Sequence, residues 1–340
     1  MSARSGILGG GNWIVDKLKF IDVYPQQEAL GNIIGETIGN GGSPFNVLTD
    51  LARLGADFPL EGIGLTGADA DGEWIRARCA EYGIGAEQIR THPTALTAYT
   101  DVMTVKSTGK RTFFHQRGAN AFLDDEHFDF TGVSAKIFHL GYLVLLDRLD
   151  RPDPKFGTVA GRVLHRAKEA GCRTSVDVVS EDAHRFKALV PPVMPYVDYC
   201  VVNEFEAERI TGIETRPGGG ISLGAVEAAA RQLMHMGVNE WAIVHFPEGA
   251  CALGRDGGAI LQGSLRVPQA EIVSMVGAGD AFVAGVLYGL HEEEPIKQAL
   301  LYGVAAAASC LYGPGTSDGV RPVAECLELE RRFGARALAG

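Results

Sequence analysis

Residues 277–279 are Gly, Ala and Gly, and Asp280 follows them at the start of an apolar stretch that runs to residue 290. This composition predicts a helix buried on all sides, with Asp280 in its first turn. The free N–H groups of such a helix end bind anions, and small residues leave them accessible. Asp280 could then accept a proton from a substrate hydroxyl beside this anion site. On these residues alone, a simple N-cap role for Asp280 is an equal alternative.

Three other polar clusters lie at helix starts or strand ends. They are Gly41, Gly42 and Asn46 in a Gly-rich turn, Asn12 and Asp16 after the first apolar run, and Asn203 and Glu206 after a short strand. Glycine allows a ligand to approach the backbone closely, and amide side chains can bind hydroxyl groups. Taken one at a time, however, each cluster is also explained as an ordinary turn or an acidic helix start.

The composition limits the classes of partner. The chain has 340 residues, of which 46% are hydrophobic, so it can form a large core as one α/β domain with or without a small appendage. Its 31 Lys and Arg are outnumbered by 42 Asp and Glu, which gives a net charge of −11. An acidic chain without a basic run argues against nucleic acid or an anionic membrane as partner.

Cysteine and histidine spacing indicates a cytoplasmic protein without a structural metal. The six cysteines are far apart and form no CxxC pair, which favours buried free thiols in a reducing compartment. The nine histidines form no pair with ligand spacing. Since the sequence also shows no secretory hydrophobic region and no membrane-spanning run, we expect a cytoplasmic location.

Strand and helix patterns alternate along most of the chain. Strands are expected at about 7–15, 58–64, 137–146, 174–179, 199–202, 240–245 and 250–253, and helices at about 47–54, 71–82, 156–170, 225–236, 280–290, 296–311 and 323–333. This alternation predicts an α/β fold with a mostly parallel central sheet and helices on both faces.

Two segments differ from this pattern. Residues 97–116 are rich in strand formers and contain a turn signal at 107–110, which predicts a β-hairpin. The poor alternation and the polar residues of 18–38 predict an extended, partly exposed segment. Together the two segments predict a small separate sheet, whose apolar face needs cover from a ligand cleft or another subunit.

Two common nucleotide-binding motifs are absent from the sequence. The glycines at 9–11 do not have GxGxxG spacing, and the Gly-rich stretch at 217–220 lacks the Lys-Ser/Thr of a Walker A loop. Nucleotide chemistry would therefore need another anion site, for which residues 277–280 are the candidate.

The order of these motifs resembles the pfkB, ribokinase-like carbohydrate kinase family over nearly the whole chain. The matching stretches are 276–280 with 284–285, 41–46 with 54–56, the glycines and aspartates of 64–72, residues 118–120 after the hairpin, and 203–206 with 211–212. Each stretch alone is modest evidence, whereas their common order is specific.

The resemblance implies a ribokinase-like fold in one catalytic domain, 1–340, with a lid formed by about 18–38 and 97–117. It implies ATP-dependent transfer of the γ-phosphoryl group to a hydroxyl of a small sugar or sugar derivative. Asp280 would be the base, and the N–H groups around Gly277, Ala278 and Gly279 would form the anion hole. The lid is also where this family often dimerises, so a homodimer through the lid is an expectation beside a monomer.

The resemblance also assigns binding residues. The sugar would contact Asn12, Asp16, Gly41, Gly42, Asn46, Arg117 and Asn120. The nucleotide would contact Asn203, Glu206, His245, Gly249, Val304, Ala308 and Gly315. Glu206 would hold Mg²⁺ through water, because Mg²⁺ retains much of its hydration shell.

Some residues depart from the family pattern. Ser274 and Met275 replace the usual Asp-Thr, so dependence on a monovalent cation is doubtful. Pro247 stands where glycine is common in the nucleotide segment. The residues at 43–45 are not those of ribokinases proper, so ribose is not the obvious substrate.

Other functions remain open at this point. A nucleoside kinase shares both family signatures, and Tyr99, Phe113 and Phe114 could supply a stacking surface for its base. A non-catalytic sugar or nucleotide sensor is disfavoured by the presence of Asp280. A purely structural subunit predicts no stabilisation by ligands, whereas a kinase should gain stability from sugar and nucleotide.

Overall fold

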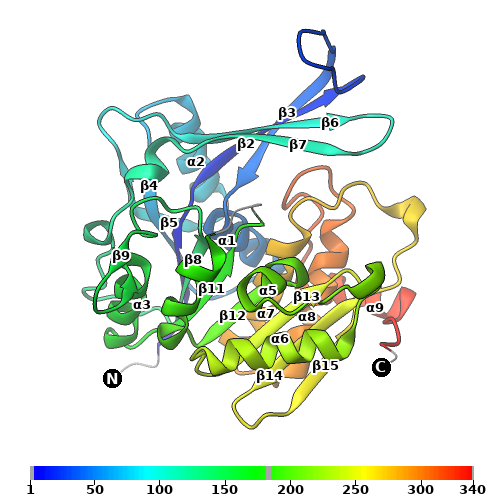
Figure 1. Ribbon diagram of the computed structural model, residues 1–340. Helices are drawn as coiled ribbons and strands as arrows, with labels where there is room; N and C mark the ends of the chain where they lie inside the picture. The colour runs from blue at the N-terminus through cyan, green and yellow to red at the C-terminus, as the bar shows by residue number, and fades with distance from the viewer. Residues whose placement is uncertain (1–3, 181–184, 339–340) are drawn as a thin grey trace.

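A nine-stranded sheet forms the centre of the computed structural model, which describes residues 4–180 and 185–338 (Figure 1). Its order is β15-β14-β13-β12-β11-β8-β1-β4-β5, and all neighbours from β13 to β5 are parallel. The strands are β1 (Ile7–Gly11), β4 (Leu60–Thr66), β5 (Ile84–Thr91), β8 (Ile137–Leu143), β11 (Arg173–Val178), β12 (Tyr199–Asn203), β13 (Trp241–Phe246), β14 (Gly249–Gly254) and β15 (Ala259–Gly263).

Helices cover both faces of this sheet, which confirms the predicted α/β fold class (Figure 1). They are α1 (Ser43–Leu54), α2 (Ala70–Glu81), α3 (Val159–Glu169), α4 (Phe186–Leu189), α5 (Glu204–Thr211), α6 (Leu223–His235), α7 (Ala278–His291), α8 (Ile296–Cys310) and α9 (Val323–Phe333). A short antiparallel pair, β9 (Pro152–Asp153) and β10 (Gly157–Thr158), precedes α3. For this reason α3 begins later than the predicted residue 156.

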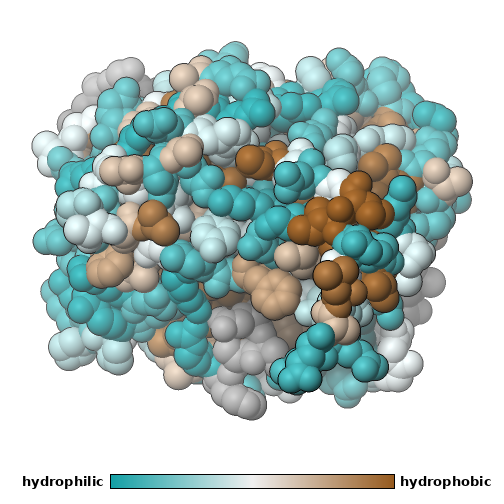
Figure 2. Space-filling model, turned by 90° about the horizontal axis from the view of Figure 1, so that it is seen from above, coloured by the Kyte–Doolittle hydropathy of each residue, from teal (hydrophilic) through white to brown (hydrophobic). Residues whose placement is uncertain are grey.

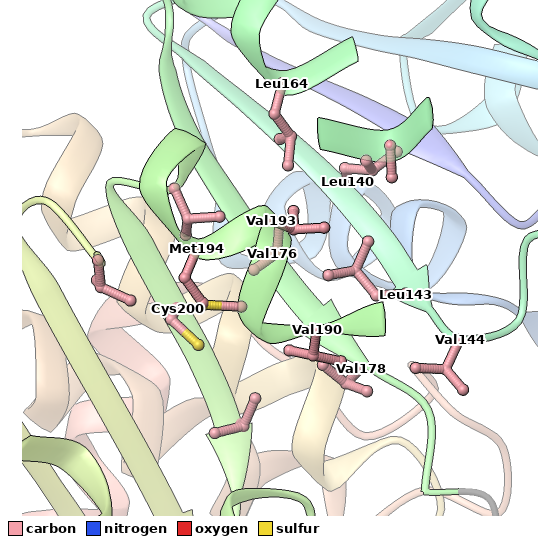
Figure 3. Packing of buried hydrophobic residues seen from close by; sticks show 14 of the residues in the cluster. Leu140, Leu143, Val144, Leu164, Val176, Val178, Val190, Val193, Met194 and Cys200 are labelled. Atoms are coloured by element: carbon pink, nitrogen blue, oxygen red, sulfur yellow. The ribbon is translucent and has the colours of Figure 1, made fainter. Parts of the chain in front are cut away.

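Two hydrophobic cores result from the alternation of side chains along each strand. In β12, Cys200 and Val202 belong to the core beneath α3 to α6, whereas Tyr199 and Val201 belong to the core beneath α1, α2 and α7 to α9. Figure 3 shows part of the first core, where Val176 of β11 and Cys200 of β12 lie near Met194. The six cysteines are all free and buried.

The four-stranded sheet, called the lid below, extends above the main sheet (Figure 1). Its strands are β2 (Ile14–Ile21), β3 (Ile33–Gly41), β6 (Ala98–Val105) and β7 (Arg111–Gln116), in the order β3-β2-β6-β7. The structure therefore confirms the predicted β6–β7 hairpin, and it shows that residues 18–38 belong to a second hairpin.

The predicted single strand at 7–15 is wrong. β1 ends at Gly11 in the main sheet, and β2 begins at Ile14 in the lid. Trp13 lies fully buried at the bend, where its indole N–H donates to the carbonyl of Ile63 over 2.8 Å. The apolar run continues through this bend, so composition alone could not locate it.

Two edge strands, β5 and β15, were not predicted. Each lies at an end of the main sheet and buries few of its side chains. Such strands lack the apolar runs of the central ones. Within residues 4–180 and 185–338, no helix combines the length and apolar character needed to cross a bilayer.

Candidate active site

A cavity of about 720 Å³ lies between the lid and the carboxyl ends of four parallel strands. Tyr142, Asp177, Asn203 and His245 line it from the ends of β8, β11, β12 and β13. Ligands commonly bind at this edge of an open α/β sheet, because side chains from several strand ends meet there. The cavity is therefore the place to look for chemistry.

The N-terminus of α7 forms one wall of the cavity. Gly277 is the N-cap with φ of 77°, a conformation that favours glycine. A Cβ at Gly277 would lie 2.1 Å from the carbonyl oxygen of Thr316, so a side chain does not fit there. Gly277 and Gly279 both line the cavity. Among the described residues no side chain caps this helix end, which leaves its first N–H groups available to an anion.

Asp280, in the first turn of α7, is held by two side chains. Asn46 Nδ2 donates to Oδ2 over 2.8 Å, and the Tyr142 hydroxyl lies 2.9 Å from Oδ1. Burial raises the pKa of Asp280 to about 7, with a further increase from the charge of Asp177, while these two hydrogen bonds oppose the shift. A carboxylate with a pKa near neutral pH suits a general base.

Asn46 reaches Asp280 because a glycine turn starts α1. Gly42 has φ of 84°, and a Cβ there would lie 2.1 Å from the carbonyl oxygen of Asn12. The Asn46 side-chain oxygen accepts from Asn40 Nδ2 over 2.8 Å, which orients the amide so that its NH₂ group faces Asp280. Gly42 and Asn46 both line the cavity.

Asp16 enters the cavity from the lid strand β2. Burial raises its pKa to about 7, against a hydrogen bond with the Thr100 side chain. A Cβ at Gly41 would lie 2.4 Å from Asp16 Oδ1, so Gly41 leaves room for this carboxylate without lining the cavity itself.

Asn203 and Glu206 begin α5 as a capping box. The Asn203 side-chain oxygen accepts from the Glu206 N–H over 2.8 Å, and Glu206 Oε2 accepts from the Asn203 N–H over 2.9 Å. Ser180 donates to Glu206 Oε1 over 2.6 Å. Burial raises the pKa of Glu206 to about 8. Both residues line the cavity opposite the lid.

His245 also lines the cavity, at the end of β13. Its ring lies 4.8 Å from that of Phe282, and burial lowers its pKa to about 4. His245 is therefore neutral near pH 7.

Arg117 lines the cavity at the end of the lid, where Nη1 lies 3.2 Å from Asp147 Oδ1.

Several predicted site residues lie behind the cavity wall. Asn12 accepts from the Tyr142 N–H over 2.7 Å, and Asn120 donates to the Trp13 carbonyl over 3.1 Å, so both hold backbone in place. The other residues outside the wall are Ala278, Gly249, Val304, Ala308 and Gly315. Their predicted roles remain predictions.

The cavity also contains residues that the sequence did not single out. Tyr142, Asp177, Thr100, Ser180 and Thr316 line it, together with Arg111 and His115 of β7. Tyr142 and Asp177 lie at strand ends, which was the available signal. Neither lay within a motif that drew attention to it.

The carboxyl oxygen atoms of Asp177, Glu206 and Asp280, which line the cavity, suit Mg²⁺. Asp177 Oδ1 is buried and has no hydrogen-bond partner in the part of the chain described. Asp177, Glu206 and Asp280 all line the same cavity, and the charge of Asp177 raises the pKa of the other two. Among the described residues no group of three or more His, Cys, Asp or Glu forms a metal cluster. Mg²⁺ sites typically use only one or two carboxylates with water and phosphate.

Known proteins resemble this chain in sequence. The probable fructokinase-6, chloroplastic, of Arabidopsis thaliana is 27% identical over 283 residues, which cover 79% of this chain and 68% of that protein. The ribokinase of the same plant is 26% identical over 302 residues, covering 86% and 74%.

Solved structures share the architecture. The structure of Arabidopsis thaliana ribokinase complexed with ribose and ATP matches with a TM-score of 0.77 at 22% identity, covering 96% of this chain and 98% of that one. This match confirms the predicted ribokinase-like fold. The model of the pfkB family of carbohydrate kinases matches residues 14–322. The chain therefore belongs to the pfkB family of carbohydrate kinases.

Proposed function

We propose that the protein transfers the γ-phosphoryl group of ATP to a hydroxyl group of a small sugar or sugar derivative. The observation that carries this proposal is Asp280, held by Asn46 and Tyr142 beside the uncapped N-terminus of α7. This arrangement supplies a base and an anion site side by side. ATP as donor is supported by the related ribokinase, whose structure contains ribose and ATP.

The proposed step is a direct displacement. The substrate hydroxyl oxygen bonds to the γ-phosphorus as the bond to the bridging oxygen of ADP breaks, and the hydroxyl proton passes to Asp280. The N–H groups at the start of α7, around Gly277 and Gly279, stabilise the charge on the transferred phosphoryl oxygens. The products are the sugar phosphate and ADP.

Asp16 and Asn46 would orient the sugar hydroxyls, because the half-buried carboxyl group of Asp16 and the buried amide of Asn46 lie at the wall of the cavity. Asn203, Glu206 and His245 would lie along the nucleotide side. Asp177 and Glu206 would hold Mg²⁺, which when bound neutralises phosphate charge. The Ser180 and Asn203 hydrogen bonds fix the Glu206 carboxyl for this purpose.

A sugar fits the lid better than a nucleoside. Of the three aromatic residues that could stack on a base, only Phe113 lines the cavity. Tyr99 instead contacts Lys17, and Phe114 is 50% exposed. Phe113 lies between Arg111 and His115 on β7, so the stacking surface is small.

The buried free thiols support a reducing location such as the cytoplasm.

Substrate screening with one catalytic variant tests the proposal. Thermal unfolding with sugars, sugar acids and nucleosides, with and without Mg²⁺ and a non-hydrolysable ATP analogue, should give a stability gain for one class that increases with nucleotide. ADP release should then confirm turnover of that class. Asp280→Asn should lose most turnover, about 100-fold or more, yet keep nucleotide binding. Wild-type-like turnover by this variant would remove Asp280 from the role of base.

A further inference from the structure

The lid side of the cavity concentrates positive charge. Arg111, Phe113 and His115 line the cavity from one face of β7, and Arg117 follows at the same spacing. Alternate residues of a strand share a face, so this row points toward the cavity as a unit. The whole chain carries a net charge of −11, and a row with two arginines contrasts with that excess of acid.

Carboxyl groups line the rest of the cavity, three of them on the main-sheet side and Asp16 on the lid strand β2. The three on the main-sheet side are Asp177 at the end of β11, Glu206 of α5 and Asp280 of α7. Carboxylates at a sugar site accept hydrogen bonds from hydroxyl groups, but they repel an anionic substituent. A substrate that carries both hydroxyls and an anionic group would therefore bind with its hydroxyls toward the carboxylates and its anionic group toward β7.

Arg111 has no counter-ion in residues 4–180 and 185–338. It is half-buried, no carboxylate forms an ion pair with it, and burial lowers its pKa. A partly desolvated guanidinium without a carboxylate partner gains more from an anionic ligand than a fully hydrated one does. Its position on β7 pairs with Thr104, near the tip of the hairpin.

Arg117 keeps donors free as well. Asp147 Oδ1 lies 3.2 Å from Nη1, but Nη1 is buried without a well-aligned hydrogen bond among the described residues. A guanidinium has five N–H donors, and it binds carboxylate or phosphate oxygens through two of them at once. Between the two arginines, His115 contacts the Thr100 hydroxyl over 3.0 Å.

Resting on the proposed function, we propose that the sugar substrate is an anion, whose carboxylate or phosphate group binds Arg111 and Arg117 of the lid. The hydroxyl to be phosphorylated then lies toward Asp280, at the other end of the molecule. This assigns the substrate class as sugar acids or sugar phosphates rather than neutral sugars.

Matched substrates test the inference on the wild-type protein. Each of several neutral hexoses is compared with its aldonate and with its phosphate, using ATP, Mg²⁺ and ADP release. We expect kcat/KM for one anionic member to exceed that of its neutral hexose by about 100-fold or more, since two charge-assisted contacts are gained. A preference for the aldonate or for the phosphate identifies which anion the site accepts.

Variants locate the anion site. Arg111→Gln and Arg117→Gln should each raise KM for the anionic substrate about 10- to 100-fold, with a smaller change in kcat. Arg111→Lys should recover part of the loss, because it restores the charge. Lys110→Gln is the matched control, since Lys110 is an exposed neighbour on the same hairpin that does not line the cavity. Melting temperatures close to the wild type confirm that each variant is folded.

Two outcomes would overturn the inference in distinguishable ways. If neutral hexoses are phosphorylated as efficiently as their anionic partners, or if Arg111→Gln and Arg117→Gln both behave like Lys110→Gln, the anionic substrate class is wrong and the kinase function stands. If the folded wild-type protein phosphorylates none of the neutral or anionic compounds, the proposed function fails as well.

Discussion

The hydroxyl group of Tyr142 donates to the carboxylate of Asp280, at 2.9 Å from Oδ1 and 3.2 Å from Oδ2. Tyr142 itself is positioned by its backbone N–H, which donates to Asn12 Oδ1 over 2.7 Å. Thus a residue behind the cavity wall, Asn12, helps to orient the proposed base through Tyr142. This relationship gives Tyr142 the role of a positioning residue.

Tyr142→Phe should lower kcat about 10-fold or more, because Asp280 loses one of its two orienting hydrogen bonds. That hydrogen bond also lowers the pKa of Asp280, so its loss should shift the acid limb of the kcat/KM profile to higher pH. Steady-state kinetics between pH 5.5 and 8.5 would measure both effects. Tyr312→Phe, which removes a hydroxyl bound to Glu271 away from the cavity, is the control. An unshifted acid limb in Tyr142→Phe would contradict the positioning role.

The wild-type enzyme should lose activity as pH falls below about 7. Burial raises the pKa of Asp280 to about 7, and only the ionised form can accept the hydroxyl proton. Asp16 and Glu206, with pKa values raised to about 7 and about 8, titrate in the same range, so the profile reports the group of carboxyls. The dependence of kcat/KM for the sugar on pH, measured at saturating ATP, would show this loss of activity at acid pH. A rate that stays constant down to pH 5.5 would exclude a base with this pKa.

Asp50→Asn should stabilise the protein at neutral and alkaline pH. Asp50 is fully buried in α1, and burial raises its pKa well above its ordinary value, with a further increase from the charge of Asp280. The folded state therefore holds this proton more tightly than the unfolded state. Stability from this group is greatest below the ordinary pKa of aspartate and is lost as pH rises toward the folded pKa.

Melting temperatures of the wild type and of Asp50→Asn at pH 5.5 and pH 8 would test whether Asp50 lowers the stability of the protein as pH rises. The advantage of the variant should be larger at pH 8, by roughly a few degrees for each kcal/mol gained. Asp256→Asn, at an exposed turn, should show no such pH-dependent gain. An advantage of the variant that is the same at pH 5.5 and pH 8 would mean that Asp50 is already ionised in the folded protein.

The lid should pair with a second copy of the chain. Its face away from the cavity exposes Ile34, Ile38 and Phe114, which are 49%, 51% and 50% exposed. The view onto the lid shows hydrophobic residues gathered in patches on this side of the molecule (Figure 2). Exposed apolar faces of this kind are typical of association surfaces.

Ile38→Asp would introduce a charge into this surface and should shift a dimer to monomer in sedimentation velocity. Leu261→Asp is a control at a similarly exposed apolar position on β15. A wild-type protein that sediments as a monomer at micromolar concentration would rule out a stable lid dimer.

The central strands and most helices could be predicted because their apolar patterns are strong. α9 begins and ends where the pattern predicted, and the Gly277–Asp280 corner forms the wall that its small residues indicated. The bend at Trp13 could not be predicted, since it depends on a hydrogen bond to Ile63, far along the chain. Tyr142 and Asp177 were missed for the same reason: only the sheet order brings their strand ends to Asp280.

The lid is built from two separate stretches of chain, β2–β3 and β6–β7. Strand β1 of the main sheet precedes the first stretch, and strands β4 and β5 of the main sheet lie between the two stretches. An experiment that exchanges only the lid with that of a relative would therefore have to replace two separate segments of the sequence. One of the junctions would fall between Gly11 and Ile14, where Asn12 and Trp13 are fully buried. In directed evolution or natural recombination, this lid and its sheet should thus be inherited together.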